Sequence, residues 1–274
     1  MKKNHWTKCP ILAAIAICVC SISGLAGQRD SWDKMDCNNS YNSYGDRLVS
    51  HCEVREETIQ SGGSLSVDGK QNGGISVKGW DQNNILVRSR VQTGAPSASE
   101  ARDLATQVSV KTGGNQIYAE GPANNRDRQW SVSYEIFVPR QFNLNLKSHN
   151  GGINVSEVNG RIDFDALNGG VALNKLAGNV HGSTTNGGLF ITLDGDRWDG
   201  EGMDVRTSNG GITMNVPENY SAHLETSTVN GGMNFGFPIT VSGRLNRDIS
   251  VDLGSGGATV RAITTNGGVN VKRR

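Results

Sequence analysis

The tripeptide Asn-Gly-Gly recurs along this chain, and the spacing of its copies limits the possible folds more than any other feature. Its asparagines stand at positions 72, 150, 168, 186, 209, 230 and 266. Asn159-Gly160-Arg161 and Ala177-Gly178-Asn179 fall halfway between copies, so the unit is nine residues long and two units make eighteen. Repeats of fixed length indicate a solenoid, in which each unit packs mainly on its neighbours.

Apolar residues alternate with polar ones within these units. The fourth positions hold Ile153, Ile162, Val171, Val180 and Leu189, and the sixth positions hold Val155, Phe164, Leu173, Gly182 and Ile191. A spacing of two places such residues on one face of a strand. Because Asn and Gly adopt positive φ at low cost, we expect each unit to be a turn followed by a short strand.

Stacked strands can bury this apolar row at about 4.8 Å per layer, so residues 150–274 allow about seven coils of eighteen residues over about 33 Å. The residues predicted to stack one coil apart are Ile153, Val171 and Leu189 in the core, and Asn150, Asn168 and Asn186 in an amide ladder. The later intervals between copies are 23, 21 and 36 residues. We interpret them as coils with insertions of five and three residues that leave the stack as loops, followed by a double coil.

The chain before the repeat has a different texture. Strand-like alternation runs through Ser64–Asp68, Gly74–Val77, Ile85–Val91, Val108–Lys111 and Trp130–Val138. Ser97 and Glu100 form a capping box ahead of Ala101, Leu104 and Ala105, which predicts one short helix. We expect this β-rich region, residues 56–141, to cap the open N-terminal end of the solenoid.

The first 27 residues have the charged, apolar and small-residue order of a secretory signal peptide. The apolar run at residues 11–22 is shorter than the roughly 20 residues of a membrane span. We expect cleavage after Ala26 or Gly27, and no stable membrane insertion afterwards. The alternative is a lipoprotein acylated at Cys18 or Cys20, although neither follows a small residue.

Composition and charge narrow the class of protein. The chain has 36 glycines and only 6% aromatic residues, which leaves little material for a large globular core. Cleavage removes three lysines and no acid, so the formal net charge falls from +1 to −2. A near-neutral surface of mixed sign argues against nucleic acid as a partner.

Two cysteines, Cys37 and Cys52, remain after cleavage. In an oxidising compartment they allow a single pairing, which would close a loop of about 15 residues and contribute about 3 kcal/mol to stability. The alternatives are two free thiols or a metal pair with His51 nearby. We predict the disulfide.

Three features of the sequence resemble a known bacterial family. They are GWDQNNILVRSRV at residues 79–91, SVSYEIFVPRQFNLNLKSHNGGINV at residues 131–155, and the phased Asn-Gly-Gly turns with Val216-Pro217. Over about residues 56–272 the chain is similar to adhesin-type domains of the DUF4097 family, relatives of the GIN head domains attributed to autotransporter adhesins. The resemblance implies a right-handed β-helix-like fold and an exported, cell-envelope setting. It supplies no mechanism, since a fold is not a function.

Polysaccharide lyases and hydrolases also use β-solenoids, so the carboxylates have to be tested as catalysts. Glycosidic chemistry needs two carboxyl groups about 5–9.5 Å apart across a sugar. Asp163 and Asp165 share a strand face, but Ile162 and Phe164 take the inward positions, so both acids should face solvent. We expect no catalytic residues.

The best binding candidate is the insertion LDGDRWDGEGMD. It contains a cluster of acids around one aromatic residue, and the residues assigned to the site are Asp196, Arg197, Trp198, Asp199 and Glu201. An aromatic face with flanking polar groups suits a sugar ring. The alternative, which we favour, is a surface loop whose Trp198 packs back onto the solenoid.

Other chemistries lack their residues. The calcium-binding nonapeptide GGxGxDxUx carries a recurrent acid, whereas NGGVALNKL has none, so we expect no metal. There is no GxSxG, HExxH or CxxC, and the histidines have no ligand spacing, so we also expect no cofactor.

The sequence therefore predicts an all-β protein, a β-helix-like solenoid with a β-rich N-terminal cap that contains one short helix. Its parts are a signal peptide at 1–27, a disulfide-bearing segment at 28–55, the cap at 56–141 and the Asn-Gly-Gly solenoid at 142–274. We expect a non-catalytic periplasmic or extracellular module that presents a surface to an envelope glycan or protein. A polysaccharide-active enzyme is the alternative.

Overall fold

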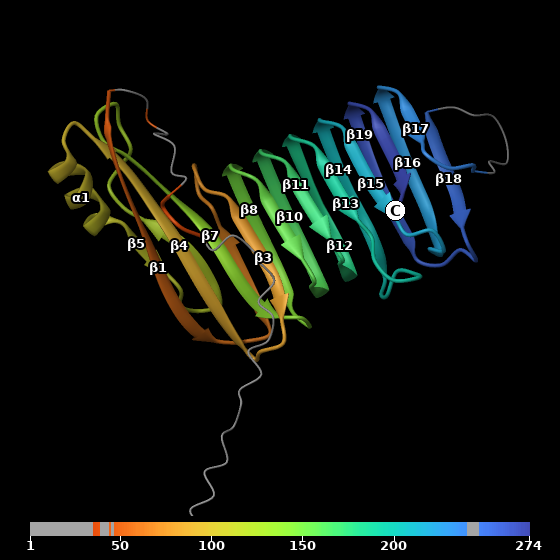
Figure 1. Cartoon of the computed structure of the whole chain (residues 1–274), viewed down its shortest axis with the longest axis horizontal. Helices are drawn as coiled ribbons and strands as arrows, with labels where there is room; N and C mark the ends of the chain where they lie inside the picture. The colour runs from red at the N-terminus through yellow and green to blue at the C-terminus, as the bar shows by residue number, and fades with distance from the viewer. Residues whose placement is uncertain (1–34, 39–43, 45–46, 240–246) are drawn as a thin grey trace, which may run out of the picture. The chain divides into compact units, whose positions relative to one another are not determined.

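Two ten-stranded sheets form the fold in a computed structural model, which describes residues 35–38, 44, 47–239 and 247–274 (Figure 1). Sheet A contains, in spatial order, β1 (Val49–Gln60), β4 (Asn84–Ala95), β7 (Gln129–Pro139), β3 (Ile75–Trp80), β9 (Ile153–Ser156), β11 (Val171–Asn174), β13 (Leu189–Thr192), β15 (Ile212–Val216), β20 (Val269–Arg273) and β17 (Met233–Phe235). Sheet B contains β18 (Asp248–Leu253), β16 (Ala222–Asn230), β19 (Thr259–Asn266), β14 (Gly202–Asn209), β12 (Ala177–Asn186), β10 (Asn159–Asn168), β8 (Asn143–Asn150), β2 (Ser64–Asp68), β6 (Gln116–Glu120) and β5 (Ser109–Lys111). The predicted signal peptide lies outside the described residues.

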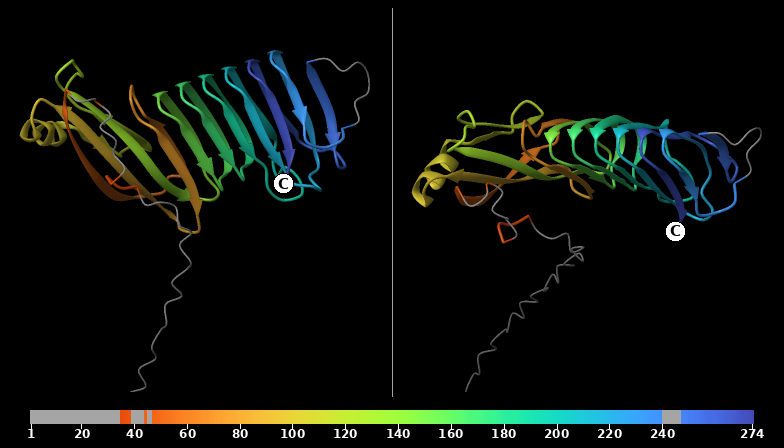
Figure 2. Two further views of the ribbon diagram at one scale, coloured as in Figure 1. Left: turned by 45° about the horizontal axis from the view of Figure 1, so that its top comes forward. Right: turned by 90° about the horizontal axis from the view of Figure 1, so that it is seen from above.

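Each coil joins one strand of sheet B to one strand of sheet A through an Asn-Gly-Gly turn, and the strands of successive coils lie side by side in parallel (Figure 2). Val171 of β11 pairs with Ile153 on one side and Leu189 on the other. All three are buried, which confirms the predicted phase. Inward residues of both sheets form one continuous core.

The two nonapeptides of a coil differ, which corrects the prediction of one turn in every unit. Asn159-Gly160-Arg161 and Ala177-Gly178-Asn179 begin strands β10 and β12 instead of forming turns. The chain turns just before them, at Glu157 and Lys175, which have φ of 57° and 53°. Strands in sheet B are consequently long, while β9, β11 and β13 of sheet A have four residues each.

The glycines of the turns are needed for close approach between coils, and the expected role of positive φ is wrong. In these described turns no glycine of an Asn-Gly-Gly has φ in the left-handed region. A β-carbon on Gly169 would instead lie 2.2 Å from the carbonyl oxygen of Gly151, and one on Gly187 would lie 2.0 Å from that of Gly169. The first glycine of the turn therefore lets successive coils stack.

The predicted amide ladder is present and includes all seven turns. The asparagines follow one another in the order Asn72, Asn150, Asn168, Asn186, Asn209, Asn266 and Asn230, and each Nδ2 donates to the Oδ1 of the preceding asparagine over 2.8–3.1 Å. The amide dipoles therefore all point the same way along the stack.

Hydroxyl groups form a second ladder inside the turns. They belong to the residues two positions before the asparagines, which are Ser148, Thr184, Thr207, Thr264 and Thr228. Each donates to a glycine carbonyl of the adjacent coil over 2.7–3.0 Å. Ala166 takes the place of the hydroxyl residue in the coil of Asn168. In the preceding coil, Ser148 also donates to the carbonyl of Gly151, at 2.8 Å. The buried turn carbonyls are thereby satisfied.

The coils do not stack in chain order. The coil of Asn266, made of β19 and β20, lies between the coils of Asn209 and Asn230. The expected double coil over the 36-residue interval is therefore wrong. That interval contains β18, which pairs antiparallel with β16 at the end of sheet B. It also contains residues 240–246, which are not among the described residues.

Strands from the region before residue 142 extend both sheets at the other end of the stack. β2 and β3 form a coil beside β8 and β9, so Asn72 enters the ladder. β7 follows β3 in sheet A, and β4 and β1 add to it in antiparallel fashion. Helix α1 (Ala98–Gln107) begins at the predicted N-cap Ser97, whose Oγ accepts from the Glu100 N–H. No helix among the described residues is long and apolar enough to span a membrane.

Candidate functional site

The predicted binding loop lies between β13 and β14, and its backbone pairs with neighbouring coils, because the Gly178 N–H donates to the Asp199 carbonyl and the Ser221 N–H donates to the Asp196 carbonyl, each over 2.7 Å. Its aromatic residue, Trp198, is only 5% exposed, and Nε1 donates to the Gly178 carbonyl at 3.0 Å. The indole therefore fills a gap at the edge of the core. It cannot offer a face to a sugar ring, so this part of the binding hypothesis is wrong and the packed-back alternative describes Trp198.

The polar residues of the loop remain accessible. The side chains of Asp196 and Arg197 are 81% and 77% exposed and lie 3.9 Å apart. They border a hollow of about 550 Å³ with Asn219 and Ser255 on its other side. Asp199 is exposed, and Glu201 accepts a hydrogen bond from Asn179. The binding role of these four residues stays a prediction.

The acids of this region are held separately. Asp194 pairs with Arg274 at 2.6 Å, whereas Asp204 pairs with Arg206 at 3.0 Å. The hydrogen bond from Arg206 lowers the pKa of Asp204, against a smaller opposing effect of burial. A glycosidase would need one acid of raised pKa facing a second carboxylate. The pKa of Asp204 is lowered instead of raised, which is the opposite of what a general acid needs.

Sheet B presents a charged outer face. Asp163 accepts from Arg161 at 2.8 Å on the same strand, while Arg261 bridges Asp204 and Glu225 at 3.6 and 3.5 Å across three strands. Asp165 is exposed and Asp163 is partly exposed, as expected for outward positions. Exposed pairs of this kind contribute little to stability but keep the face hydrated.

One cluster on this face resembles a hydrolytic triad in its connectivity. His223 Nδ1 lies 2.7 Å from Asp252 Oδ1, and Nε2 lies 3.0 Å from Ser250 Oγ. The side chains of His223 and Asp252 are 32% and 67% exposed on the sheet surface. A working triad needs a buried carboxylate and donors for the oxyanion. The solvated Asp252 does not meet the first of these requirements.

The outer face of sheet A from β9 to β17 differs sharply from the outer face of sheet B. The strands β9, β11, β13, β15, β20 and β17 contain no Asp or Glu, and their only charged residues are Lys272 and Arg273. Their outward positions carry amides, hydroxyls and Phe190, which is 55% exposed. Sequence reasoning missed this face because it followed charged residues. The signal was available in the fifth and seventh positions of the Asn-Gly-Gly units, which are never acidic.

A second hollow of about 610 Å³ lies beside the first coil. Lys70, Asn72, Pro122 and the partly exposed Trp130 are among its lining residues. The Trp130 Nε1 group donates to the Pro122 carbonyl at 2.6 Å, so the ring is fixed in place. The sequence predicted Trp130 as a strand residue and gave no sign of the hollow.

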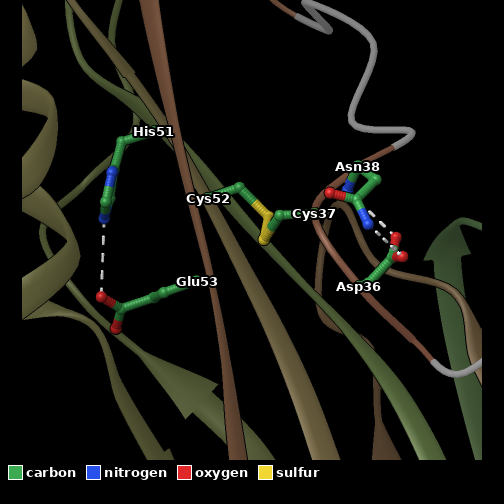
Figure 3. Close-up of a disulfide and its surroundings, with 6 residues drawn as sticks. All are labelled: Asp36, Cys37, Asn38, His51, Cys52 and Glu53. Atoms are coloured by element: carbon green, nitrogen blue, oxygen red, sulfur yellow. Dashed lines mark hydrogen bonds and ion pairs between the residues drawn. A yellow bond between two sulfur atoms is a disulfide. The ribbon is translucent and has the colours of Figure 1, made fainter.

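The predicted disulfide is present (Figure 3). Cys37 and Cys52 are bonded, with their Cα atoms 5.8 Å apart, and the bond ties the segment before β1 to that strand. His51 Nε2 lies 3.5 Å from the carboxylate of Glu53, two positions further along the strand. Among the residues that the structure describes, no group of three or more His, Cys, Asp and Glu is arranged to hold a metal ion.

The solved structures that match this chain differ from it widely in sequence. A "putative cell adhesion protein" from Clostridium sporogenes matches 82% of this chain and 100% of its own, at 9% identity and a TM-score of 0.45. A "putative adhesin" from Bacteroides fragilis matches 82% and 97%, at 12% identity and a TM-score of 0.38. A "putative lipid binding protein" from Parabacteroides distasonis matches 80% and 96%, at 9% identity and a TM-score of 0.35.

No curated protein matches the sequence. The family indicated by the GWD, YEIFVP and Asn-Gly-Gly segments is confirmed. The model of the toastrack family DUF4097 matches residues 39–272, and this chain belongs to that family.

Proposed function

We propose that this protein is an exported, non-catalytic module of the bacterial cell envelope that binds a partner through its β-solenoid surface. The observation that carries the proposal is the contrast between the charged outer face of sheet B and the outer face of β9 to β17 in sheet A, which is almost free of charge. Catalysis needs groups that converge in a shielded site with tuned pKa values. The acids considered as catalysts here stand on an open surface or pair separately with cations.

The setting follows from other features. A signal peptide at 1–27 would deliver the chain to an oxidising compartment, where the Cys37–Cys52 bond can form. We place the protein in the periplasm or outside the cell, with an envelope glycan or protein as its partner. We also propose that the coil is right-handed, the hand that parallel strand crossovers nearly always adopt.

The test is capture and turnover with one sample. The mature chain, oxidised and starting at residue 28, is incubated with purified envelope polysaccharides and peptidoglycan, and bound material and released reducing ends are both measured. Saturable capture without release supports the proposal. Release of new reducing ends would instead establish the alternative, a polysaccharide-active enzyme on the same solenoid.

Variants locate the contact without damaging the core. Trp198→Ala would remove a buried side chain, so Arg197→Ala and Asp196→Asn are the informative changes in the loop. Ser250→Ala tests the hydrolytic alternative, because it removes the hydroxyl beside His223 while leaving an exposed surface position. If capture does not occur with any envelope fraction, the proposed function fails.

A further inference from the structure

We propose that the outer face of sheet A, from β9 to β17, is the binding surface and that its ligand is a neutral polysaccharide. This amide face consists of Asn154, Asn174, Phe190, Thr213, Asn215 and Asn270. The inference rests on the proposed binding function and goes further, since it names the face and the chemical class of the ligand.

The charge of the face selects the ligand. An acidic polymer would need a row of cations, and Lys272 is the only outward cation on these six strands. A basic partner would need carboxylates, which the strands lack. Uncharged amides and hydroxyls instead offer both donors and acceptors, and these match the hydroxyl groups of a neutral sugar.

Phe190 supplies the apolar part of the contact. Its neighbours Leu189 and Ile191 are buried in the core, so Phe190 points outward. The far end of its ring lies over Gly188 and Gly170, where ideal β-carbons would stand 3.3 and 3.8 Å from Cε2. The bare backbone of two successive turns therefore leaves room for the ring on the surface. Aromatic side chains pair an apolar face with the polar groups around them in this way at binding sites.

The groups on the face repeat along the stack. The strand register aligns Asn154, Ala172, Phe190 and Thr213 in one row and Asn174 with Asn215 in the next. Asn174 Nδ2 donates to Asn154 Oδ1 at 3.3 Å, which fixes both amides and leaves each with further capacity. Because strands are about 4.8 Å apart, a polymer lying across them meets similar groups at regular intervals. Several weak contacts on one chain then add up to useful affinity.

The experiment uses the mature, disulfide-bonded protein in affinity electrophoresis through gels that contain one soluble polysaccharide each. The neutral probes are dextran, hydroxyethyl cellulose, mannan and arabinogalactan, and the acidic probes are polygalacturonate and hyaluronate. We expect retardation by at least one neutral probe and by neither acidic probe. Phe190→Ala should weaken binding about tenfold, the effect of losing one stacked aromatic contact.

Two further variants keep the test independent of folding. Asn174→Asp adds a negative charge to the face and removes the Nδ2 donor to Asn154, and it should also weaken binding. Leu167→Ala is the matched control, because Leu167 is 37% exposed on the opposite face of the solenoid. Its affinity should be that of the unchanged protein, and melting curves should show that all three variants are folded.

Several results would overturn the inference. They are retardation by the acidic probes alone, an absence of binding to all four neutral probes, and full binding by both Phe190→Ala and Asn174→Asp. A Phe190→Ala effect on sedimentation without one on glycan binding would show that the face joins two copies of the chain. Envelope capture that survives both variants would refute this inference while leaving the proposed function intact.

Discussion

At the residue scale, the first glycine of each Asn-Gly-Gly turn has no room for a side chain, whereas the second has more. A β-carbon on Gly169 would meet backbone atoms of Gly151 and Gly152 at 2.2–2.9 Å, but one on Gly170 would come no closer than 3.6 Å. We expect Gly169→Ala to lower the free energy of unfolding by about 2–3 kcal/mol, the cost of overpacking. Gly170→Ala, the matched control, should cost less than about 1 kcal/mol. Urea unfolding measures both, and equal losses would contradict the close-approach argument.

Tyr134 carries a buried hydroxyl without a hydrogen-bond partner in the described structure, although the residue is only 1% exposed. Burial raises the pKa of this phenol well above its ordinary value. Tyr134→Phe keeps the ring and removes the unsatisfied group, so the free energy of unfolding should rise by about 1 kcal/mol. The variant should also lose less stability above pH 10, where the unfolded tyrosine ionises but the folded one stays protonated. A destabilised variant would show that the hydroxyl has a partner.

Asp204 should make stability depend on acid pH. Its pKa is lowered in the folded state, chiefly by the hydrogen bond from Arg206. The contribution is therefore complete above the ordinary carboxyl pKa of about 3.9, and is lost as the pH falls through the lower folded value. The free energy of unfolding, measured between pH 5 and pH 2, should depend less on pH for Asp204→Asn than for the control Asp199→Asn. Asp199 is an exposed acid of the preceding loop. Parallel curves would refute the assignment.

At the element scale, the asparagine ladder joins coils that are already paired through their backbones. Asn186 donates to Asn168 and accepts from Asn209, whereas Asn230 at the end of the ladder only donates, to Asn266. Each exposed amide bond should contribute about 0.5 kcal/mol, the low end of the usual range. Asn186→Ala should therefore cost about twice as much as Asn230→Ala in thermal unfolding. Equal costs would mean that the amides add nothing to the strand pairing.

The sequence predicted several elements from local patterns, but it missed β1 and also β6 and β18, although alternate residues of the last two are buried. The alternation in Ile153–Val155 and the capping box at Ser97 each report a local physical requirement, so both were confirmed. β1 was missed because it is an edge strand without a buried residue, and its outward glutamates hide the pattern. Trp198 could not be placed from the sequence, since an indole in a loop suits either a ligand or the core.

At the scale of the whole molecule, the order of the coils could not be predicted. All seven turns share the tripeptide Asn-Gly-Gly, so the tripeptide does not identify which coil lies beside it. Spacing led to a double coil after Asn230, whereas pairing inserts the last coil between Asn209 and Asn230. The amide face could be predicted only in part, because its composition is local but its width depends on this inserted coil.

The inserted coil should behave as the middle of the stack although its strands come after all the others in the sequence given. Terminal segments usually fray and exchange amide hydrogens quickly. β19 and β20 instead pair on both sides, with β14 and β15 on one and with β16 and β17 on the other. Amides of residues 260–264 should therefore exchange as slowly as those of β12 and more slowly than those of β18, which pairs on one side only. Fast exchange at residues 260–264 would contradict the inserted position.

Truncation gives the second readout of the same topology. A chain that ends at residue 257 lacks β19 and β20, through which the described β16 and β17 pair with the rest of the stack. If the last coil is inserted, residues 222–235 should lose their protection from exchange, while β8 to β13 keep theirs because their partners remain. If the coils stacked in chain order, truncation would trim one end and leave residues 222–235 protected. If adding a peptide of residues 258–274 restores this protection, the truncated chain still has a site at which β19 and β20 can pair.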